Sequence, residues 1–210
     1  MAIKHFVIFP FNGNGLEALD CINQDKYNFV GFIDDDPNRS DKKHKLFSRD
    51  ILVKNKELYI LAVPGSPASY KLRESLINSL RIPLKRFLTI IHPKAVIGKN
   101  VSIGVNCLIM AGVVLTSNVI IGNHVCILPN TVIHHDTIIG DYSLIGSNVS
   151  IAGNCIIEKN CYIGSGTAII HNVKVGAMSL VGLGSNVIKN VEDNAKMVGN
   201  PARNLNLQAV

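Results

Sequence analysis

The 210-residue sequence predicts an α/β domain followed by a parallel β-helix. Two observations support this prediction. Strands alternate with helices over the first 90 residues, which is typical of a parallel sheet, and an unbroken six-residue repeat runs from Ile91 to Val191. We therefore expect two domains, residues 1–90 and residues 91–210.

The six-residue repeat is marked by an aliphatic residue that recurs seventeen times without an insertion. Four residues after each such position comes a small or short β-branched residue, such as Cys107 or Thr131. A helix of 3.6 residues per turn cannot keep a period of six on one face. The pattern instead indicates a solenoid whose short strands stack into one core. The repeated positions are Ile91, Ile97, Ile103, Ile109, Leu115, Ile121, Ile127, Ile133, Ile139, Ile145, Ile151, Ile157, Ile163, Ile169, Val175, Val181 and Val187.

The N-terminal domain is expected to contain four strands and two helices, with a glycine-containing turn after the first strand. His92-Pro93 marks the start of the solenoid, because the residue before a proline favours extended backbone. The expected strands cover residues 3–10, 27–34, 59–63 and 86–91; the turn covers 11–15, and the helices cover 16–23 and 69–80.

Composition narrows the function classes. The formal net charge is +6, and residues 1–90 carry most of the charged side chains, which suits a phosphorylated small molecule better than nucleic acid. No apolar run is long enough for a transmembrane helix, so we expect no membrane insertion. The five cysteines form no C-x-x-C pair, and three occupy the small position of the repeat, so we expect buried, reduced thiols and a cytoplasmic location.

The first strand, turn, helix and second strand are arranged as in one half of a doubly wound nucleotide-binding domain. Gly13 and Gly15 would let the backbone approach a phosphate at a helix N-terminus. Asp34 and Asp35 end the second strand, where carboxylates can accept hydrogen bonds from ribose hydroxyls or base N–H groups. A plain turn followed by a solvated acidic loop would give the same pattern.

The solenoid offers one corner with catalytic potential, His134-His135-Asp136. An imidazole beside a carboxylate suits a general base, because the carboxylate fixes the tautomer and stabilises the imidazolium. A solvated corner residue is one alternative, and a metal ligand is another, since His171 lies 36 residues, or two coils, after His135. The γ-class carbonic anhydrases use such a pair with a third histidine, and Gly176 stands at that place here, so we expect no metal.

Seven short motifs, taken together and in order, resemble the NeuD/PglD-like sugar acyltransferases. These enzymes carry hexapeptide repeats behind an N-terminal nucleotide-sugar-binding domain. The motifs lie at residues 11–15 (FNGNG), 32–35 (FIDD), 91–93 (IHP), 133–136 (IHHD), 139–141 (IGD), 152–154 (AGN) and 199–202 (GNPA).

The resemblance implies a Rossmann-like domain, a left-handed β-helix and a homotrimer with sites between neighbouring solenoids. It implies acetyl-CoA-dependent N-acetylation of a nucleotide-linked amino sugar in bacterial surface-glycan biosynthesis. By it, His135 is the general base and Asp136 its acidic partner. Gly13, Asn14, Asp34 and Asp35 would hold the nucleotide sugar.

Acetyl-CoA would lie along the groove between two solenoids. We expect the Gly153 N–H to face the thioester oxygen, and Lys189 and Arg203 to be among the basic residues near its phosphates, together with Lys174 and Lys196.

This sequence departs from the family at Asn14 and Leu144, where relatives often have histidine, and at Leu128, where they often have asparagine. His134 stands where an acidic residue is usual. Two alternatives stay open, a sugar O-acetyltransferase of the sialic-acid type and a non-catalytic nucleotide-sugar-binding protein.

Overall fold

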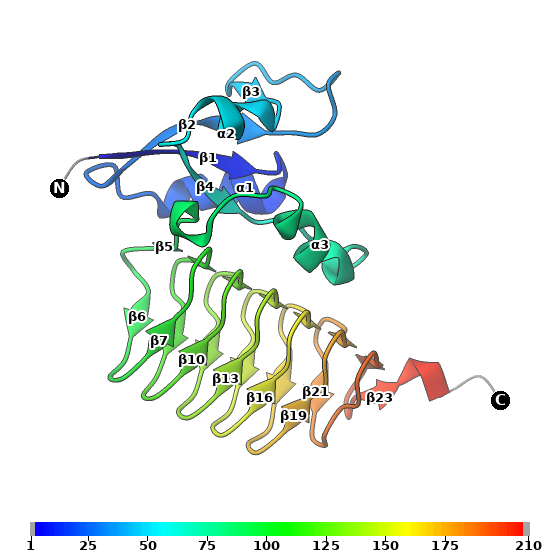
Figure 1. Cartoon of the computed structure of the whole chain (residues 1–210). Helices are drawn as coiled ribbons and strands as arrows, with labels where there is room; N and C mark the ends of the chain where they lie inside the picture. Colours follow the sequence, from blue (N-terminus) through cyan, green and yellow to red (C-terminus); the bar gives the residue numbers. More distant parts are fainter. Residues whose placement is uncertain (1–2, 208–210) are drawn as a thin grey trace.

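The computed structural model describes residues 3–207 of the chain. A four-stranded sheet forms the N-terminal domain, and three sheets of very short strands form the solenoid beside it (Figure 1). This confirms the predicted fold class, a Rossmann-like α/β domain followed by a left-handed parallel β-helix. The predicted domain boundary at residue 90 stays a prediction. In the described part of the chain, no helix has the length and apolar character needed to cross a membrane.

The N-terminal sheet is wholly parallel and has the strand order β3-β2-β1-β4. Its apolar strand β1 lies between two neighbours, and its last four residues are buried. The strands are β1 (Lys4–Phe9), β2 (Tyr27–Ile33), β3 (Leu46–Phe47) and β4 (Tyr59–Ala62). Three of the four predicted strands are therefore confirmed; β3 was not predicted.

The helices of this domain are short, and the first begins earlier than expected. α1 starts at Gly13, inside the predicted turn, because the Asn12 side chain accepts a hydrogen bond from Gly15 N (2.8 Å) and caps the helix. The predicted helix over 69–80 is a 3₁₀ turn followed by α3, and α2 was not predicted. The helical segments are α1 (Gly13–Glu17), α2 (Asp50–Lys54), α3 (Arg73–Asn78) and 3₁₀ turns at Ala18–Cys21, Tyr70–Leu72, Leu84–Arg86 and Leu205–Leu207.

The strand predicted over residues 86–91 is confirmed only at its end, where Ile90 and Ile91 form β5. Leu84–Arg86 is a 3₁₀ turn, and Phe87 makes a single bridge to Ile60 at the edge of the N-terminal sheet. Burial of the Arg86 guanidinium fixes this path, because it donates to three backbone carbonyls, each at 2.8 Å. Ile90 and Ile91 then pair with β8 and so begin the solenoid.

Each coil of the solenoid contributes one strand to each of three sheets, which we call sheets I, II and III. Sheet I contains β5 (Ile90–Ile91), β8 (Leu108–Ile109), β11 (Cys126–Ile127), β14 (Leu144–Ile145), β17 (Tyr162–Ile163), β20 (Leu180–Val181), β22 (Lys196–Val198) and the antiparallel β23 (Arg203–Asn204). Sheet II contains β6 (Val96–Ile97), β9 (Val114–Leu115), β12 (Val132–Ile133), β15 (Ser150–Ile151), β18 (Ala168–Ile169) and β21 (Asn186–Val187). Sheet III contains β7 (Ser102–Ile103), β10 (Ile120–Ile121), β13 (Ile138–Ile139), β16 (Ile156–Ile157) and β19 (Lys174–Val175).

The register of these sheets confirms the repeat inferred from the sequence. Ile121 pairs with Ile139, and Ile139 with Ile157, so one coil takes 18 residues, and the aliphatic positions from Ile109 to Val187 stack in the core. Ile91 and Ile97, in the first coil, are exposed. The coil turns through residues in the left-handed conformation, with φ between 54° and 63° at most corners. Asparagine tolerates this conformation better than other non-glycine residues.

The small positions of the repeat also carry hydrogen bonds from coil to coil. Thr131 Oγ1 donates to the Gly146 carbonyl (2.7 Å) and accepts from Val149 N (3.2 Å). Cys161 Sγ takes the same place and lies 3.2 Å from the Gly176 carbonyl. All five cysteines are free and buried, as predicted, and burial raises the pKa of the Cys161 thiol to about 12. These thiols are inert core groups.

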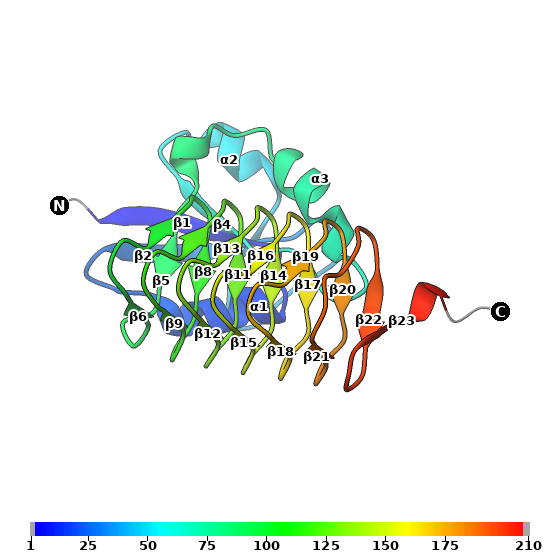
Figure 2. The ribbon, with the colours of Figure 1, turned by 90° about the horizontal axis from the view of Figure 1, so that it is seen from below.

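The N-terminal domain covers the outer face of sheet I. Leu108, Cys126 and Leu144 point away from the solenoid core and pack into one cluster with Phe6 and Leu61 of the N-terminal sheet. In Figure 2 the domain lies behind the solenoid, on this side of it. Among residues 3–207, the N-terminal domain leaves the outer faces of sheets II and III uncovered.

A buried arginine joins the two parts. The Arg73 side chain is 1% exposed, and its guanidinium donates to the backbone carbonyls of Pro64, His124 (2.6 Å) and Tyr142 (2.7 Å). One cation thus holds the segment after β4 against two successive coils.

Candidate active site at a solenoid corner

The predicted catalytic residues lie at a corner between sheets II and III. β12 ends at Ile133 and β13 begins at Ile138, so four residues make the turn. Asp136 adopts the left-handed conformation (φ 60°), and the next side chain, Thr137, returns to the core. The repeat therefore directs His135 and Asp136 outward, with 57% and 45% of their side chains exposed in the single chain.

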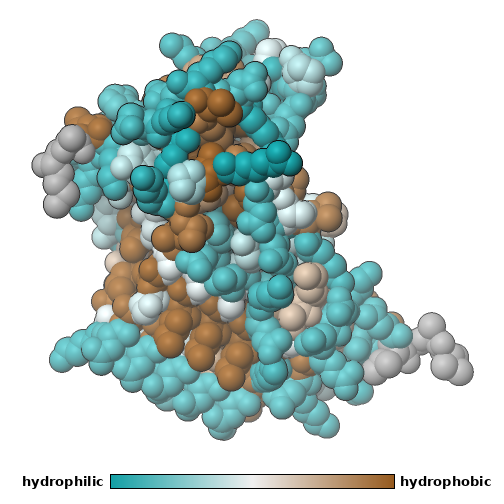
Figure 3. Space-filling view, viewed as in Figure 1, coloured by the Kyte–Doolittle hydropathy of each residue, from teal (hydrophilic) through white to brown (hydrophobic). Residues whose placement is uncertain are grey.

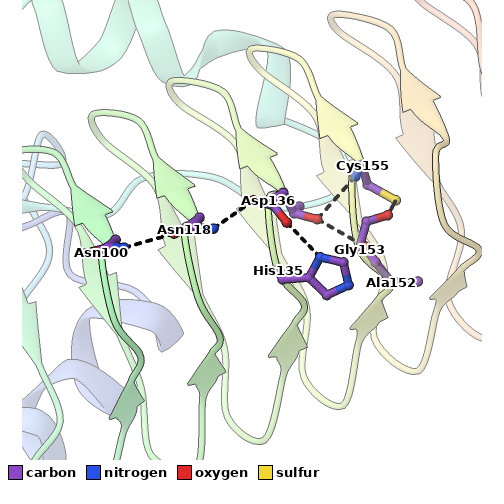
Figure 4. Close-up of polar contacts among 8 residues, drawn as sticks. Asn100, Asn118, His135, Asp136, Ala152, Gly153 and Cys155 are labelled. Carbon is purple, nitrogen blue, oxygen red and sulfur yellow. Dashed lines mark hydrogen bonds and ion pairs between the residues drawn. The ribbon is translucent and has the colours of Figure 1, made fainter.

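The two side chains form a hydrogen-bonded pair. His135 Nδ1 lies 2.7 Å from Asp136 Oδ2 (Figure 4). Hydrogen bonds from Asn118 and then from His135 lower the pKa of the Asp136 carboxyl below its usual value, so it is ionised at neutral pH. An ionised carboxylate accepts only, which places the imidazole proton on Nδ1 and leaves Nε2 free to take a proton. This is the arrangement of a general base.

Gly153 lies directly against the imidazole of His135, one coil further along. A β-carbon at Gly153 would come within 2.6 Å of both Cε1 and Nε2 of the ring. The absence of a side chain therefore creates the space that the ring occupies. The sequence suggested Gly153 for its N–H group, and the structure places its backbone beside the Cε1–Nε2 edge of the ring.

The corner continues as a row of residues on successive coils. His135, Gly153, His171 and Lys189 follow one another because β12, β15, β18 and β21 pair in register. Coils stack about 4.8 Å apart, so Lys189 lies roughly 14 Å along the row from His135. Arg203 is exposed on β23 in sheet I, so it does not converge with Lys189 within one chain. Lys174, another predicted CoA contact, pairs with Glu158 at 2.6 Å.

The row does not assemble a metal site from the residues that the structure describes. Within residues 3–207, no three His, Cys, Asp or Glu side chains are grouped so that they could hold a metal ion. His134 is half-buried on the sheet II side of the corner, and His171 is exposed.

Gly13 and Asn14 line a cavity of about 320 Å³ on the other side of the solenoid. α1 brings them there, and Asn14 Nδ2 donates to the Gly65 carbonyl (3.4 Å), which joins two loops at the carboxyl ends of β1 and β4. The full lining is Asn12, Gly13, Asn14, Gly65, Ser66, Pro67, Leu128, Leu144 and Tyr162. The loop 64–67 and Tyr162 were not predicted as site residues, although P-G-S-P directly after a strand is a sequence signal for such a loop.

Leu128 and Leu144, two positions at which this sequence departs from the family pattern, both line this cavity. The resemblance drawn from the sequence implied asparagine and histidine at these two places. The wall that sheet I presents to the cavity is therefore apolar here.

Asp34 and Asp35 are not part of the cavity lining, and each carboxylate already has an arginine partner. Asp34 Oδ2 lies 3.1 Å from Arg39, whose guanidinium stacks 4.7 Å from the Phe11 ring. Asp35 binds Arg49 through both oxygens, at 2.6 and 2.7 Å. Arg39 thus brings Asp34 near Phe11 of the glycine-containing turn. The cavity beside Gly13 and Asn14 is lined without either aspartate.

Comparison with known proteins begins with the repeat. Residues 100–135, 118–153 and 136–171 match the model of the bacterial transferase hexapeptide (six repeats) family. Residues 100–171 of the solenoid therefore match hexapeptide repeats of this type. The matched windows span residues 100–171, about a third of the chain, and they contain the whole His135–Asp136–Gly153 cluster.

Solved structures share the fold over nearly the full chain. A variant of perosamine N-acetyltransferase from Caulobacter crescentus, in complex with CoA and GDP-perosamine, has a TM-score of 0.85 and 24% identity, with 97% of each chain covered. The acetyltransferase domain of PglB from Neisseria gonorrhoeae, in complex with acetyl coenzyme A, has a TM-score of 0.84 and 20% identity over 97% of this chain and 100% of that chain. WeeI from Acinetobacter baumannii has a TM-score of 0.81 and 24% identity over the same shares.

No curated protein sequence matches the chain. At identities below 25%, the structural likeness establishes a shared fold. The resemblance drawn from the sequence is confirmed for the hexapeptide repeat and for the two-domain architecture. Any reaction assigned to this chain must be argued from the residues of this chain.

Proposed function

We propose that this protein transfers the acetyl group of acetyl-CoA to the amino group of a nucleotide-linked amino sugar. The observation that best supports this proposal is the His135–Asp136 pair, in which Nε2 of the imidazole is left free at an outward-facing corner. The fold supports the proposal, because perosamine N-acetyltransferase shares it and was crystallised with CoA and GDP-perosamine.

In this mechanism the amine nitrogen attacks the thioester carbonyl carbon, and His135 Nε2 takes the proton that the nitrogen loses. Asp136 stabilises the imidazolium that forms. The C–S bond then breaks, and the proton passes to the departing sulfur, so the products are an amide and CoA thiol. The Gly153 N–H faces the carbonyl oxygen as charge develops there. Base catalysis of this kind contributes about 10²–10⁴-fold.

The two halves of the proposed site belong to different chains of a homotrimer. In one chain, Gly13 and Asn14 line a cavity against sheet I, whereas His135 lies at the corner between sheets II and III. A neighbouring solenoid would bring one half to the other. The outer face of sheet III supports this, because Ile120, Ile138 and Ile156 are each about 40% exposed and form an apolar strip (Figure 3).

CoA would then lie along the row of corner residues, with its thioester at His135 and Gly153 and its phosphates toward Lys189. The partner chain would present Arg203. Light scattering tests the assembly, and a monomer at the concentration of the activity assay would contradict the shared site.

The reaction is tested by thiol release from acetyl-CoA with UDP-, dTDP-, GDP- and CMP-linked amino sugars, after a thermal-shift panel of the four nucleotides. His135→Ala should lower kcat at least a hundredfold with little change in KM, and His134→Ala is the matched control. An unchanged kcat in the His135 variant contradicts the assignment. Thiol release with a sugar hydroxyl in place of an amine would support O-acetylation, and none with any acceptor would support a binding protein.

A further inference from the structure

Three residues at the catalytic corner form a chain of hydrogen bonds that runs along the solenoid. Asn100, Asn118 and Asp136 occupy the same left-handed position on three successive coils, with φ of 58°, 63° and 60°. Asn100 Nδ2 donates to Asn118 Oδ1 (3.2 Å), and Asn118 Nδ2 donates to Asp136 Oδ1 (2.9 Å). Figure 4 shows the row ending at the His135 imidazole.

The chain of bonds uses both oxygens of the Asp136 carboxylate. Oδ1 accepts from Asn118, and Oδ2 lies against His135 Nδ1. Two donors on opposite oxygens fix the plane of the carboxylate, which is otherwise free to rotate because the side chain is about half exposed. Asn118 in turn cannot rotate without breaking the bond from Asn100. Aligned amides polarise one another, so the donor end of the row points at the anion.

We propose that Asn118 is a positioning residue for the general base: it acts through Asp136 to hold the His135 imidazole with its proton on Nδ1, and Asn100 supports it. The side-chain hydrogen bonds of Asn118 go to Asn100 and Asp136 and not to His135, so its effect on the imidazole passes through the carboxylate. The kinetic consequence rests on the proposed function, whereas the effect on the imidazole tautomer does not.

The test is Asn118→Gly, because glycine accepts the left-handed backbone and removes only the amide. Asn148→Gly is the matched control. Asn148 is likewise an exposed corner asparagine with φ of 55°, but it lies at the corner between sheets I and II, in a row that already contains Gly112, Gly166 and Gly184. Asn118→Ser is the second variant if the glycine variant does not fold, because serine is too short to bridge to the carboxylate.

Two measurements are made on the full-length protein. Nitrogen-15 NMR of labelled histidines, with His135→Ala for assignment, reports the tautomer of His135; we expect the Nδ1–H form to dominate in the wild type and in Asn148→Gly and to lose that dominance in Asn118→Gly. Steady-state kinetics should show kcat reduced about tenfold, as for loss of a hydrogen bond to a charged group, with KM for both substrates nearly unchanged.

A double variant separates positioning from general damage. In an Asp136→Asn background, Asn118→Gly should cause no further loss of kcat, because Asn118 acts on His135 only through the Asp136 carboxylate, which that background has already removed. An independent loss in that background overturns the proposal, as does an unchanged tautomer in the single variant. If the wild type acetylates no amino sugar, the proposed function fails, and the tautomer measurement still decides the role of Asn118.

Discussion

Because of His124, the free energy of unfolding of this protein should decrease as the pH is lowered below 6.5. The side chain is 3% exposed between the two domains, stacked on the Tyr142 ring at 4.7 Å. Asn106 Nδ2 lies 3.0 Å from its Nδ1, and the same amide donates to the Ala62 carbonyl and accepts from Ala62 N. These backbone bonds fix the orientation of the amide, so Nδ1 must accept and cannot carry a proton.

Burial lowers the pKa of His124 to about 4; nearby Asp141 opposes this shift and the buried Arg73 guanidinium adds to it. In the unfolded chain a histidine has a pKa near 6.5. Between these values the unfolded chain binds more protons, so the free energy of unfolding decreases as pH falls. The slope approaches about 1.4 kcal/mol per pH unit below pH 6.5, so the loss from pH 7.5 to 5.0 is about 2 kcal/mol in total.

The assay is urea unfolding at pH 7.5 and 5.0, at one protein concentration, for the wild type and His124→Asn. Asparagine can keep the acceptor for Asn106, tolerates the left-handed position as its row neighbours Asn106 and Asn160 do, and cannot titrate. The variant should be less stable at pH 7.5, because it loses the stacked ring. The wild type should lose about 2 kcal/mol more than the variant between the two pH values. Parallel losses would refute the reasoning.

Three further predictions concern other parts of the molecule. Gly153→Ala should displace the His135 ring and lower kcat at least tenfold with little change in melting temperature; an unchanged kcat would contradict the packing argument. Arg73→Met leaves three carbonyls without this donor, two of them buried, and should reduce the free energy of unfolding by at least about 3 kcal/mol, measured in urea, with a loss under 1 kcal/mol as the contrary result. Lys189→Glu should raise KM for acetyl-CoA but not for acetyl-pantetheine, and equal effects on both would remove Lys189 from the phosphate site.

The sequence was sufficient to predict the solenoid and the outward direction of the corner residues to which we assign the proposed chemistry. A strict period of six admits one register, so each aliphatic position had to point inward, and His135 and Asp136 had to point outward on one turn. The sequence was less informative about the N-terminal domain. The strand predicted over 86–91 shrinks to Ile90–Ile91, because the Arg86 guanidinium, bonded to distant carbonyls, holds Arg86 in a 3₁₀ turn. No local sequence pattern indicates those partners.

Tertiary structure decided everything that depends on neighbours 18 residues or more apart. Stacking of coils brought Asn118 to Asp136 and the bare backbone of Gly153 to the His135 ring, and packing of the N-terminal domain on sheet I placed Leu128 and Leu144 beside Gly13. The repeat fixes the direction of each side chain, because it is a local property of the backbone. Which groups meet is fixed by how coils and domains pack, and that is not encoded in any single stretch of the chain.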